Sequence, residues 1–132
     1  MAKTLTCIVV TPEQTALEQP ADFIALPLYD GEIGIAPNRA PLIGRLGSGE
    51  VRLKNGGKED RYYVDGGFVQ VADNVVSILT NRAVPVSQLE VAQAEKDLSE
   101  AMKKPATNDE MLDAREREVQ RLRAQIRTGK RR

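Results

Sequence analysis

Residues 31–42 read Gly-Glu-Ile-Gly-Ile-Ala-Pro-Asn-Arg-Ala-Pro-Leu, and this stretch decides the fold. It holds two glycines and two prolines, while its apolar side chains still alternate with other residues. Glycine allows backbone angles and close approaches that other residues avoid, and proline fixes φ. The stretch therefore predicts a shaped corner of a β-sheet.

Up to Pro85 the chain consists of short β-branched runs separated by turn residues, a pattern typical of an all-β sandwich. Alternation of apolar and polar side chains is clearest over 51–54 and 68–71, which indicates strands with one buried and one wet face. The sequence predicts hairpin turns at 55–57 and 73–74. It predicts strands over 4–10, 23–28, 33–35, 41–46, 50–54, 62–64, 68–71 and 75–80.

After Pro85 the pattern becomes helical. Ser87-Gln88-Leu89-Glu90 and Thr107-Asn108-Asp109-Glu110 both have the form of a capping box, so a helix is expected to begin at each. Apolar residues follow at helical spacing, with Pro105 expected to end the first helix and Gly129 the second. Two helices joined by so short a turn run antiparallel.

The predicted fold class is α+β with the two kinds of structure segregated. An N-terminal antiparallel β-sandwich covers residues 1–85, and a C-terminal antiparallel two-helix hairpin covers residues 86–132. The apolar stripes of the hairpin are narrow and rich in Ala and Met, so its independent stability is doubtful. The hairpin is expected either to pack permanently on the sandwich or to move between partners.

Composition argues against several classes of function. The 132 residues contain no histidine, so the commonest general base and the commonest metal ligand are absent. Cys7 is the only cysteine, which excludes an internal disulfide and a thiolate metal cluster, and it is expected in the core. No apolar run approaches the roughly 20 residues of a membrane span, and no signal or transit peptide is visible. Catalysis by this chain alone, a metal site and a cofactor are not expected.

The net charge of zero hides a charge asymmetry along the predicted helices. Residues 88–113 carry seven acidic and three basic side chains, whereas residues 114–132 carry eight basic and two acidic ones. Such asymmetry favours interaction with a partner, although a solvated basic face is the simpler interpretation.

Two stretches together resemble the epsilon subunit of the F-type ATP synthase: residues 31–42, and residues 63–71 running on to 74–79. They lie in the right order before a terminal helical hairpin, and the resemblance covers essentially the whole chain. It implies a non-catalytic subunit of a proton-translocating synthase, placed in the central stalk as part of the rotor. Such a subunit couples proton flow through the membrane ring to ATP synthesis in the catalytic head and restrains ATP hydrolysis through its C-terminal helices.

The resemblance also implies partners and a location. The expected partners are the gamma subunit, the c-subunit ring, and the alpha and beta subunits through the hairpin. Membrane association is then indirect, through the complex. The expected location is peripheral, on the cytoplasmic face of the bacterial inner membrane, with the stromal face of the thylakoid membrane as the alternative.

By resemblance, Glu32 is a candidate contact with polar loops of the c ring, and an ordinary solvated Glu is the alternative. Arg39 stands where the family often carries a histidine, so no role of that histidine is carried over. The candidate inhibitory contacts with acidic surfaces of the beta subunits are Arg115, Arg121, Arg123 and Arg127.

Some family members bind ATP on the folded hairpin through a motif with an aspartate and an arginine. The matching positions here are Leu89, Glu90, Gln93 and Ala94. Gln93 replaces the arginine and Glu90 the aspartate, so a guanidinium that could pair with phosphate is missing. The site is a degenerate one, and ATP binding is not expected.

Two other classes of function have less support in the sequence. The arginine-rich tail could bind nucleic acid, but the absence of Trp and the few Phe and Tyr residues leave little surface for base stacking, so nucleic acid is not an expected partner. Asp30 with Glu32, or Asp65 beside Gly66-Gly67, could serve acid–base catalysis. No base partner, metal set or phosphate loop accompanies these carboxylates.

Overall fold

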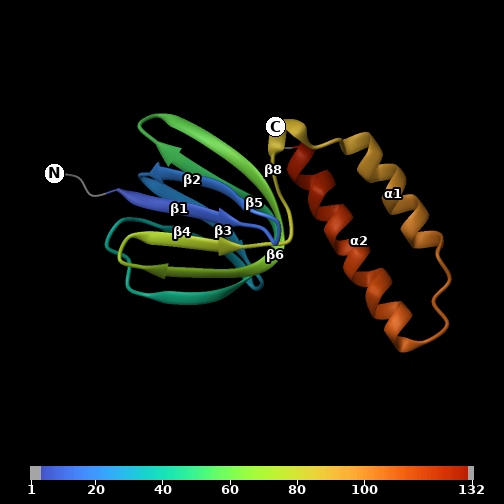
Figure 1. Ribbon diagram of the computed structural model, residues 1–132. Helices are drawn as coiled ribbons and strands as arrows, with labels where there is room; N and C mark the ends of the chain where they lie inside the picture. The colour runs from blue at the N-terminus through green and yellow to red at the C-terminus, as the bar shows by residue number, and fades with distance from the viewer. Residues whose placement is uncertain (1–3, 131–132) are drawn as a thin grey trace. The chain divides into compact units, whose positions relative to one another are not determined.

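The computed structural model describes residues 4–130 (Figure 1). These residues form two compact units that divide between Pro85 and Val86. All the strands belong to the first unit and both α-helices to the second. The predicted fold class, a β-sandwich followed by two helices, is therefore confirmed.

The first unit is built from one connected sheet of eight strands. The strand order is β2-β1-β7-β6-β5-β3-β4, with β8 paired to β6, and all pairs are antiparallel except β1 with β7. Figure 1 shows this sheet curling over itself into two layers. The strands are β1 (Leu5–Val10), β2 (Thr15–Ala21), β3 (Phe23–Leu28), β4 (Gly31–Ile35), β5 (Leu42–Asn55), β6 (Lys58–Ala72), β7 (Val75–Leu79) and β8 (Ala83–Pro85).

Strands β5 and β6 are each longer than predicted, because the expected pairs of strands are the two halves of a single bent strand. One position in β6 that only glycine can occupy is Gly67. Gly67 has φ 114°, and a Cβ there would lie 1.9 Å from the carbonyl oxygen of Leu79. Only glycine fits so close to another strand. The turns predicted at 55–57 and 73–74 are confirmed, since Gly56, Gly57, Asp73 and Asn74 all have positive φ.

Strands β2 and β8 were not predicted. β2 reads Thr-Ala-Leu-Glu-Gln-Pro-Ala, which lacks β-branched alternation, and it pairs only with β1. β8 has three residues and pairs with one half of β6. Both segments are strands because they pair with a neighbouring strand. Their own residue composition would not predict a strand.

The core of the sandwich lies between its two layers. Cys7 is fully buried in it, as expected, and burial raises the pKa of its thiol to about 12. The other buried core residues are aliphatic: Leu5, Val9, Ala21, Ile24, Leu26, Ile35, Leu46, Val51, Leu53, Val64, Val69, Val71, Val76 and Ile78.

The second unit contains a short 3₁₀ turn, η1 (Val86–Gln88), followed by α1 (Val91–Lys103) and α2 (Asp109–Lys130). The first predicted capping box is wrong, because Ser87 lies in η1 and Glu90 precedes α1 without a side-chain cap. The second is shifted by one residue. The side chain of Asn108 accepts a hydrogen bond from the Met111 N–H at 2.8 Å, so Asn108 caps α2.

The second helix ends near Gly129, as predicted, since α2 runs through Gly129 to Lys130. The hairpin has a thin seam in which Ala94, Ala101, Val119 and Leu122 are buried, with Leu98 and Ile126 packed against them. Within residues 4–130, neither helix has the length and apolar character that would let it cross a bilayer.

Candidate functional surfaces

Glu32 lies on the edge strand β4, where its carboxylate is paired with Arg52 of β5. Arg52 Nη2 donates to Glu32 Oε1 at 2.6 Å, although more than half of the Glu32 side chain is exposed. Strand β3 lies between them and places a small residue, Ala25, opposite Arg52, so the long arginine side chain can reach across it. The structure thus brings the predicted Glu32 together with a residue that the sequence did not single out.

The Glu32–Arg52 pair continues into a row of charges on the sheet. Arg52 Nε lies 3.7 Å from Glu50 Oε1, and the buried Glu50 also accepts hydrogen bonds from Arg61, whose Nε donates at 2.9 Å. The hydrogen bond to Glu50 raises the pKa of Arg61 above its ordinary value. Glu50 already accepts hydrogen bonds from Arg61. The closest acidic partner of Arg52 is therefore Glu32.

A second feature of the sandwich is a group of large apolar side chains on its surface, which we call the apolar patch: Tyr29, Ile43, Phe68 and Leu79. They are 72%, 77%, 60% and 50% exposed, respectively. Phe68 pairs with Leu79 on one side and with Arg45 on the other. The Arg45 guanidinium lies 4.8 Å from the centre of the Tyr29 ring, and Ile43 is two residues from Arg45 on the same strand face.

These register relations make the apolar patch contiguous across β5, β6 and β7. Single exposed apolar residues are common, but a contiguous group of large ones marks a docking face. The sequence did not point to this patch. The sequence did contain a signal for it. Ile43 lies on the opposite strand face from the core residue Leu46, and Leu79 on the opposite face from the core residue Ile78, so each puts an apolar side chain on the face away from the core.

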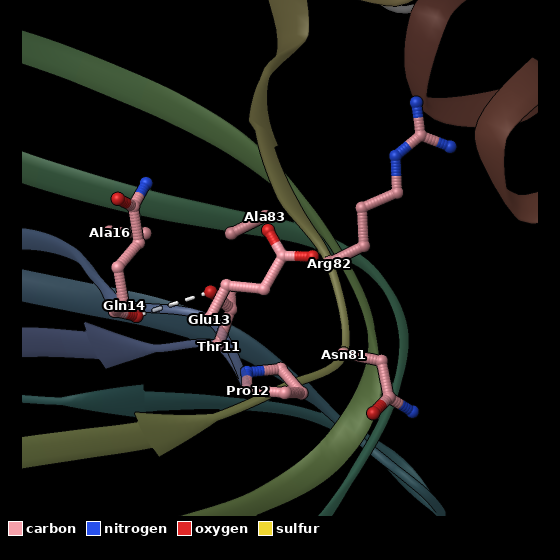
Figure 2. A pocket seen from close by; sticks show the side chains of 8 residues that line it. All are labelled: Thr11, Pro12, Glu13, Gln14, Ala16, Asn81, Arg82 and Ala83. Carbon is pink, nitrogen blue, oxygen red and sulfur yellow. Dashed lines mark hydrogen bonds between the residues drawn. The ribbon is translucent and has the colours of Figure 1, made fainter.

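A shallow hollow of about 270 Å³ lies where the β1–β2 turn meets the segment after β7. Figure 2 shows its lining, with the Thr11 hydroxyl donating to the Gln14 carbonyl at 3.1 Å and the Arg82 side chain extending away from the others. The remaining residues of the lining are Pro12, Glu13, Ala16, Asn81 and Ala83. Glu13 is the only acid among these lining residues, so the hollow offers no paired carboxylates for acid–base catalysis.

The four arginines predicted as inhibitory contacts do not form one group on α2. Arg115 Nη1 donates to the carbonyl of Lys104 at 3.0 Å, which ties it to the loop between the helices. Arg123 and Arg127 are one turn apart and share a side of α2. Arg121 is two residues from Arg123, so these two side chains project from nearly opposite sides of the helix.

The positions of the degenerate ATP motif lie together at the start of α1, where the Ala94 N–H donates to the Glu90 carbonyl at 3.0 Å. Leu89 and Glu90 precede α1, and Ala94 is buried in the seam of the hairpin. The Gln93 side chain donates to Asp97 Oδ1 at 2.9 Å, so its amide already has a partner on its own helix. Over residues 4–130, no group of three or more His, Cys, Asp or Glu side chains is arranged to hold a metal ion.

Comparison with known proteins identifies the family. The family model for "ATP synthase, Delta/Epsilon chain, beta-sandwich domain" matches residues 4–86. The ATP synthase epsilon chain of Rhodopirellula baltica is 48% identical over 124 residues, which cover 94% of this chain and 97% of that one. The chain belongs to the epsilon chains of ATP synthase. As an epsilon chain it is a non-catalytic subunit of a membrane-associated complex, and the catalytic sites lie in other subunits.

Solved structures agree with the epsilon-chain fold. A chain in the OSCP/F1/c-ring structure of the Euglena gracilis mitochondrial ATP synthase matches with a TM-score of 0.81 and 25% identity, over 92% of this chain and 78% of that one. A chain in the central stalk/c-ring structure of the Tetrahymena thermophila mitochondrial ATP synthase matches with a TM-score of 0.75 over 97% and 98% of the two chains. The second is 14% identical and supports the fold alone.

Proposed function

We propose that this chain is a rotor part of the central stalk that couples proton flow through the membrane ring to ATP synthesis in the catalytic head. In this proposal the sandwich binds the gamma subunit and rests on the c ring, and the hairpin reaches the alpha and beta subunits. The two units then act as separate domains, 1–85 and 86–132. The complex holds the chain at the cytoplasmic face of a bacterial inner membrane or, alternatively, at the stromal face of a thylakoid membrane.

The observation that carries the proposal is the apolar patch on the sandwich. Its side chains are at least half exposed in this chain, and a stable partner surface would bury them. We assign the patch to the gamma subunit, because a rotor part must be fixed firmly to the shaft. Arg45, beside Tyr29 and Phe68, adds a charge that would lie at the rim of such an interface.

Binding to gamma tests this assignment. Phe68→Ser combined with Ile43→Ser is expected to weaken binding to purified gamma about 30-fold or more, since large apolar residues at the centre of an interface dominate its affinity. Leu112→Ser, which removes an exposed apolar residue of α2, is the matched control and leaves the affinity unchanged. Equal affinity of the double variant and the control would refute the assignment.

We further propose that Glu32 contacts basic groups of the c-ring loops. The side chain is exposed at the edge of the sheet, which supports such a contact. Arg52 already pairs with Glu32. When the chain docks on the ring, Glu32 must therefore either bind Arg52 and a ring residue together or exchange Arg52 for the ring residue. Glu32→Gln is expected to weaken attachment to the ring in the assembled complex, with Glu13→Gln as the control.

The hairpin is proposed to restrain ATP hydrolysis through basic contacts with the beta subunits, drawn from Arg115, Arg121, Arg123 and Arg127. Arg121 and Arg123 project from different sides of α2, so a contact that uses both must enclose the helix. Replacing both by Ala is expected to raise ATP hydrolysis by the assembled complex. Unchanged hydrolysis across a range of salt concentrations would exclude this role. ATP sensing through Leu89, Glu90, Gln93 and Ala94 is not proposed, and titration calorimetry with ATP checks this.

A further inference from the structure

Arg45 of β5 lies beside the apolar patch, between two of its aromatic side chains. In the register of the sheet it is directly opposite Phe68 of β6. On the side of β3, the Tyr29 N–H donates to the Arg45 carbonyl at 2.8 Å, and the Arg45 guanidinium lies over the Tyr29 ring, 4.8 Å from its centre. The positive charge of this arginine is therefore flanked by apolar surface on both sides.

The segment that carries Tyr29 is held close to β5. A Cβ at Gly47 would lie 2.9 Å from the Leu28 carbonyl oxygen and 3.7 Å from Tyr29 Cα, so glycine is what allows this approach. The hydrogen bond from Tyr29 to Arg45 is a second tie between the two segments. Because the ring is held beside β5 in this way, stacking restricts the guanidinium before any partner binds. Such preorganisation lowers the entropy cost of binding through Arg45.

Arg45 differs in its ion pairing from two other arginines of the same sheet. Arg52 pairs with Glu32 at 2.6 Å. Arg61 pairs with the buried Glu50. Within the described part of the chain, no carboxylate forms an ion pair with Arg45. Stacking on an aromatic ring uses the face of a guanidinium and leaves the N–H donors at its edge available for an acceptor.

This unpaired charge limits which surfaces can cover the apolar patch. A partner that buries Phe68 and Tyr29 also removes water from the guanidinium between them. Removing a charge from water is costly unless an opposite charge takes the place of the water. A carboxylate suits a guanidinium best, because it accepts two parallel hydrogen bonds from it. A purely apolar surface of the same shape would leave the charge unpaired and is disfavoured.

We propose that Arg45 is a specificity-determining residue of the apolar patch and pairs with a carboxylate of the partner that covers the patch. The partner surface is then apolar opposite Ile43 and Phe68 and carries an acidic side chain opposite Arg45. That this partner is the gamma subunit rests on the proposed function.

The sign of one substitution separates a paired arginine from an unpaired one. Arg45→Met keeps a long apolar side chain and removes the charge. A carboxylate of gamma opposite Arg45 would lose its partner in this variant, so binding to purified gamma is expected to weaken about tenfold or more. Without such a carboxylate, the variant avoids a desolvation cost and would bind equally or more tightly. Lys58→Met is the matched control, because it removes the same charge near the β5–β6 turn, outside the apolar patch.

A double-mutant cycle with gamma identifies the acid. Each exposed Asp or Glu of gamma is changed in turn to Asn or Gln, and one of these variants is expected to lose about as much affinity as Arg45→Met does. Combined with Arg45→Met, that variant should lose little more, because the pair is already broken. Additive losses for every acid of gamma would overturn the pair, and so would binding of Arg45→Met that equals or exceeds that of Lys58→Met.

Failure of the pair and failure of the gamma assignment give different results. If Phe68→Ser with Ile43→Ser weakens binding to gamma and Arg45→Met does not, the carboxylate pair is refuted and the gamma assignment stands. If the apolar double variant binds gamma as tightly as the unchanged chain, the gamma assignment is refuted, and the pair with gamma fails with it. Circular dichroism verifies that each variant is folded.

Discussion

The β-sandwich and the helical hairpin differ in how they bury apolar side chains. The main cluster of the sandwich joins fifteen buried residues from seven strands, whereas the seam of the hairpin has four. A side chain in the sandwich core is enclosed by two layers, while one in the seam of the hairpin packs against the facing helix. One chain thus combines a unit with a large buried cluster and a unit whose seam has a small one.

The largest effect is expected at the bend of β6. Gly67→Ala places a methyl group against the Leu79 carbonyl at a φ of 114°, so the sandwich should lose about 4 kcal/mol or more of unfolding free energy. Gly56→Ala is the control, because that position also has positive φ but no atom within 4 Å, and it should cost about 1 kcal/mol. Urea denaturation measures both, and equal losses would contradict the close approach.

Leucine truncation compares the two units directly. Leu26→Ala in the sandwich should cost about 3–4 kcal/mol, whereas Leu122→Ala in the hairpin should cost about 2 kcal/mol, since its site can collapse or fill with water. All three tyrosines, Tyr29, Tyr62 and Tyr63, lie in the sandwich, so tyrosine fluorescence follows that unit while circular dichroism at the helical band follows the hairpin. Coincident transitions with both probes would show that the units unfold as one.

Alkaline pH is expected to weaken the sandwich through Cys7. Burial raises the pKa of this thiol from 9.0 to about 12, so the folded state keeps a proton that the unfolded state releases. Stability from this group is fully present below pH 9 and falls as the pH rises toward 12, by about 1.4 kcal/mol per pH unit. Denaturation of Cys7→Ala should show a shallower alkaline decline. Parallel declines in the two proteins would argue that the thiol ionises freely in the fold.

The smallest effect is expected from the ion pair near the loop end of the hairpin. Lys104→Ala removes the 3.3 Å pair with Glu118, and because the lysine is 60% exposed the loss should stay below about 0.5 kcal/mol. Thermal denaturation followed by circular dichroism checks this against the larger loss in Leu122→Ala. A loss comparable to that of the leucine would mean that charge, and not the apolar seam, holds the hairpin.

Much of the fold was predictable because its signals are local. The change from alternating strands to helical spacing, the strand at 23–28 and the turns at 55–57 and 73–74 follow from residue types within a few positions of one another. The capping boxes show the limit of local patterns. Ser87-Gln88-Leu89-Glu90 fits the motif, yet the chain forms a 3₁₀ turn there, and Asn108 caps α2 in place of Thr107.

The candidate surfaces were predictable only in part. Glu32 was singled out through the family resemblance, but its partner Arg52 is twenty residues away and meets it only because the sheet places β3 between their strands. The apolar patch likewise joins residues from three strands and the turn after β3. No short window of sequence contains such a group.

By itself, the sequence determined the change from strands to helices, the sites of the tight turns and membership of the epsilon family, because these depend on local chemistry and on a pattern of residues along the whole chain. Tertiary structure alone decided that residues 42–55 and 58–72 form single bent strands and that β2 and β8 are strands. Each of these depends on a neighbour in another strand: Leu79 against Gly67, β1 beside β2, β6 beside β8. Close packing between such neighbours sets what each position tolerates, and that information appears only once the chain is folded.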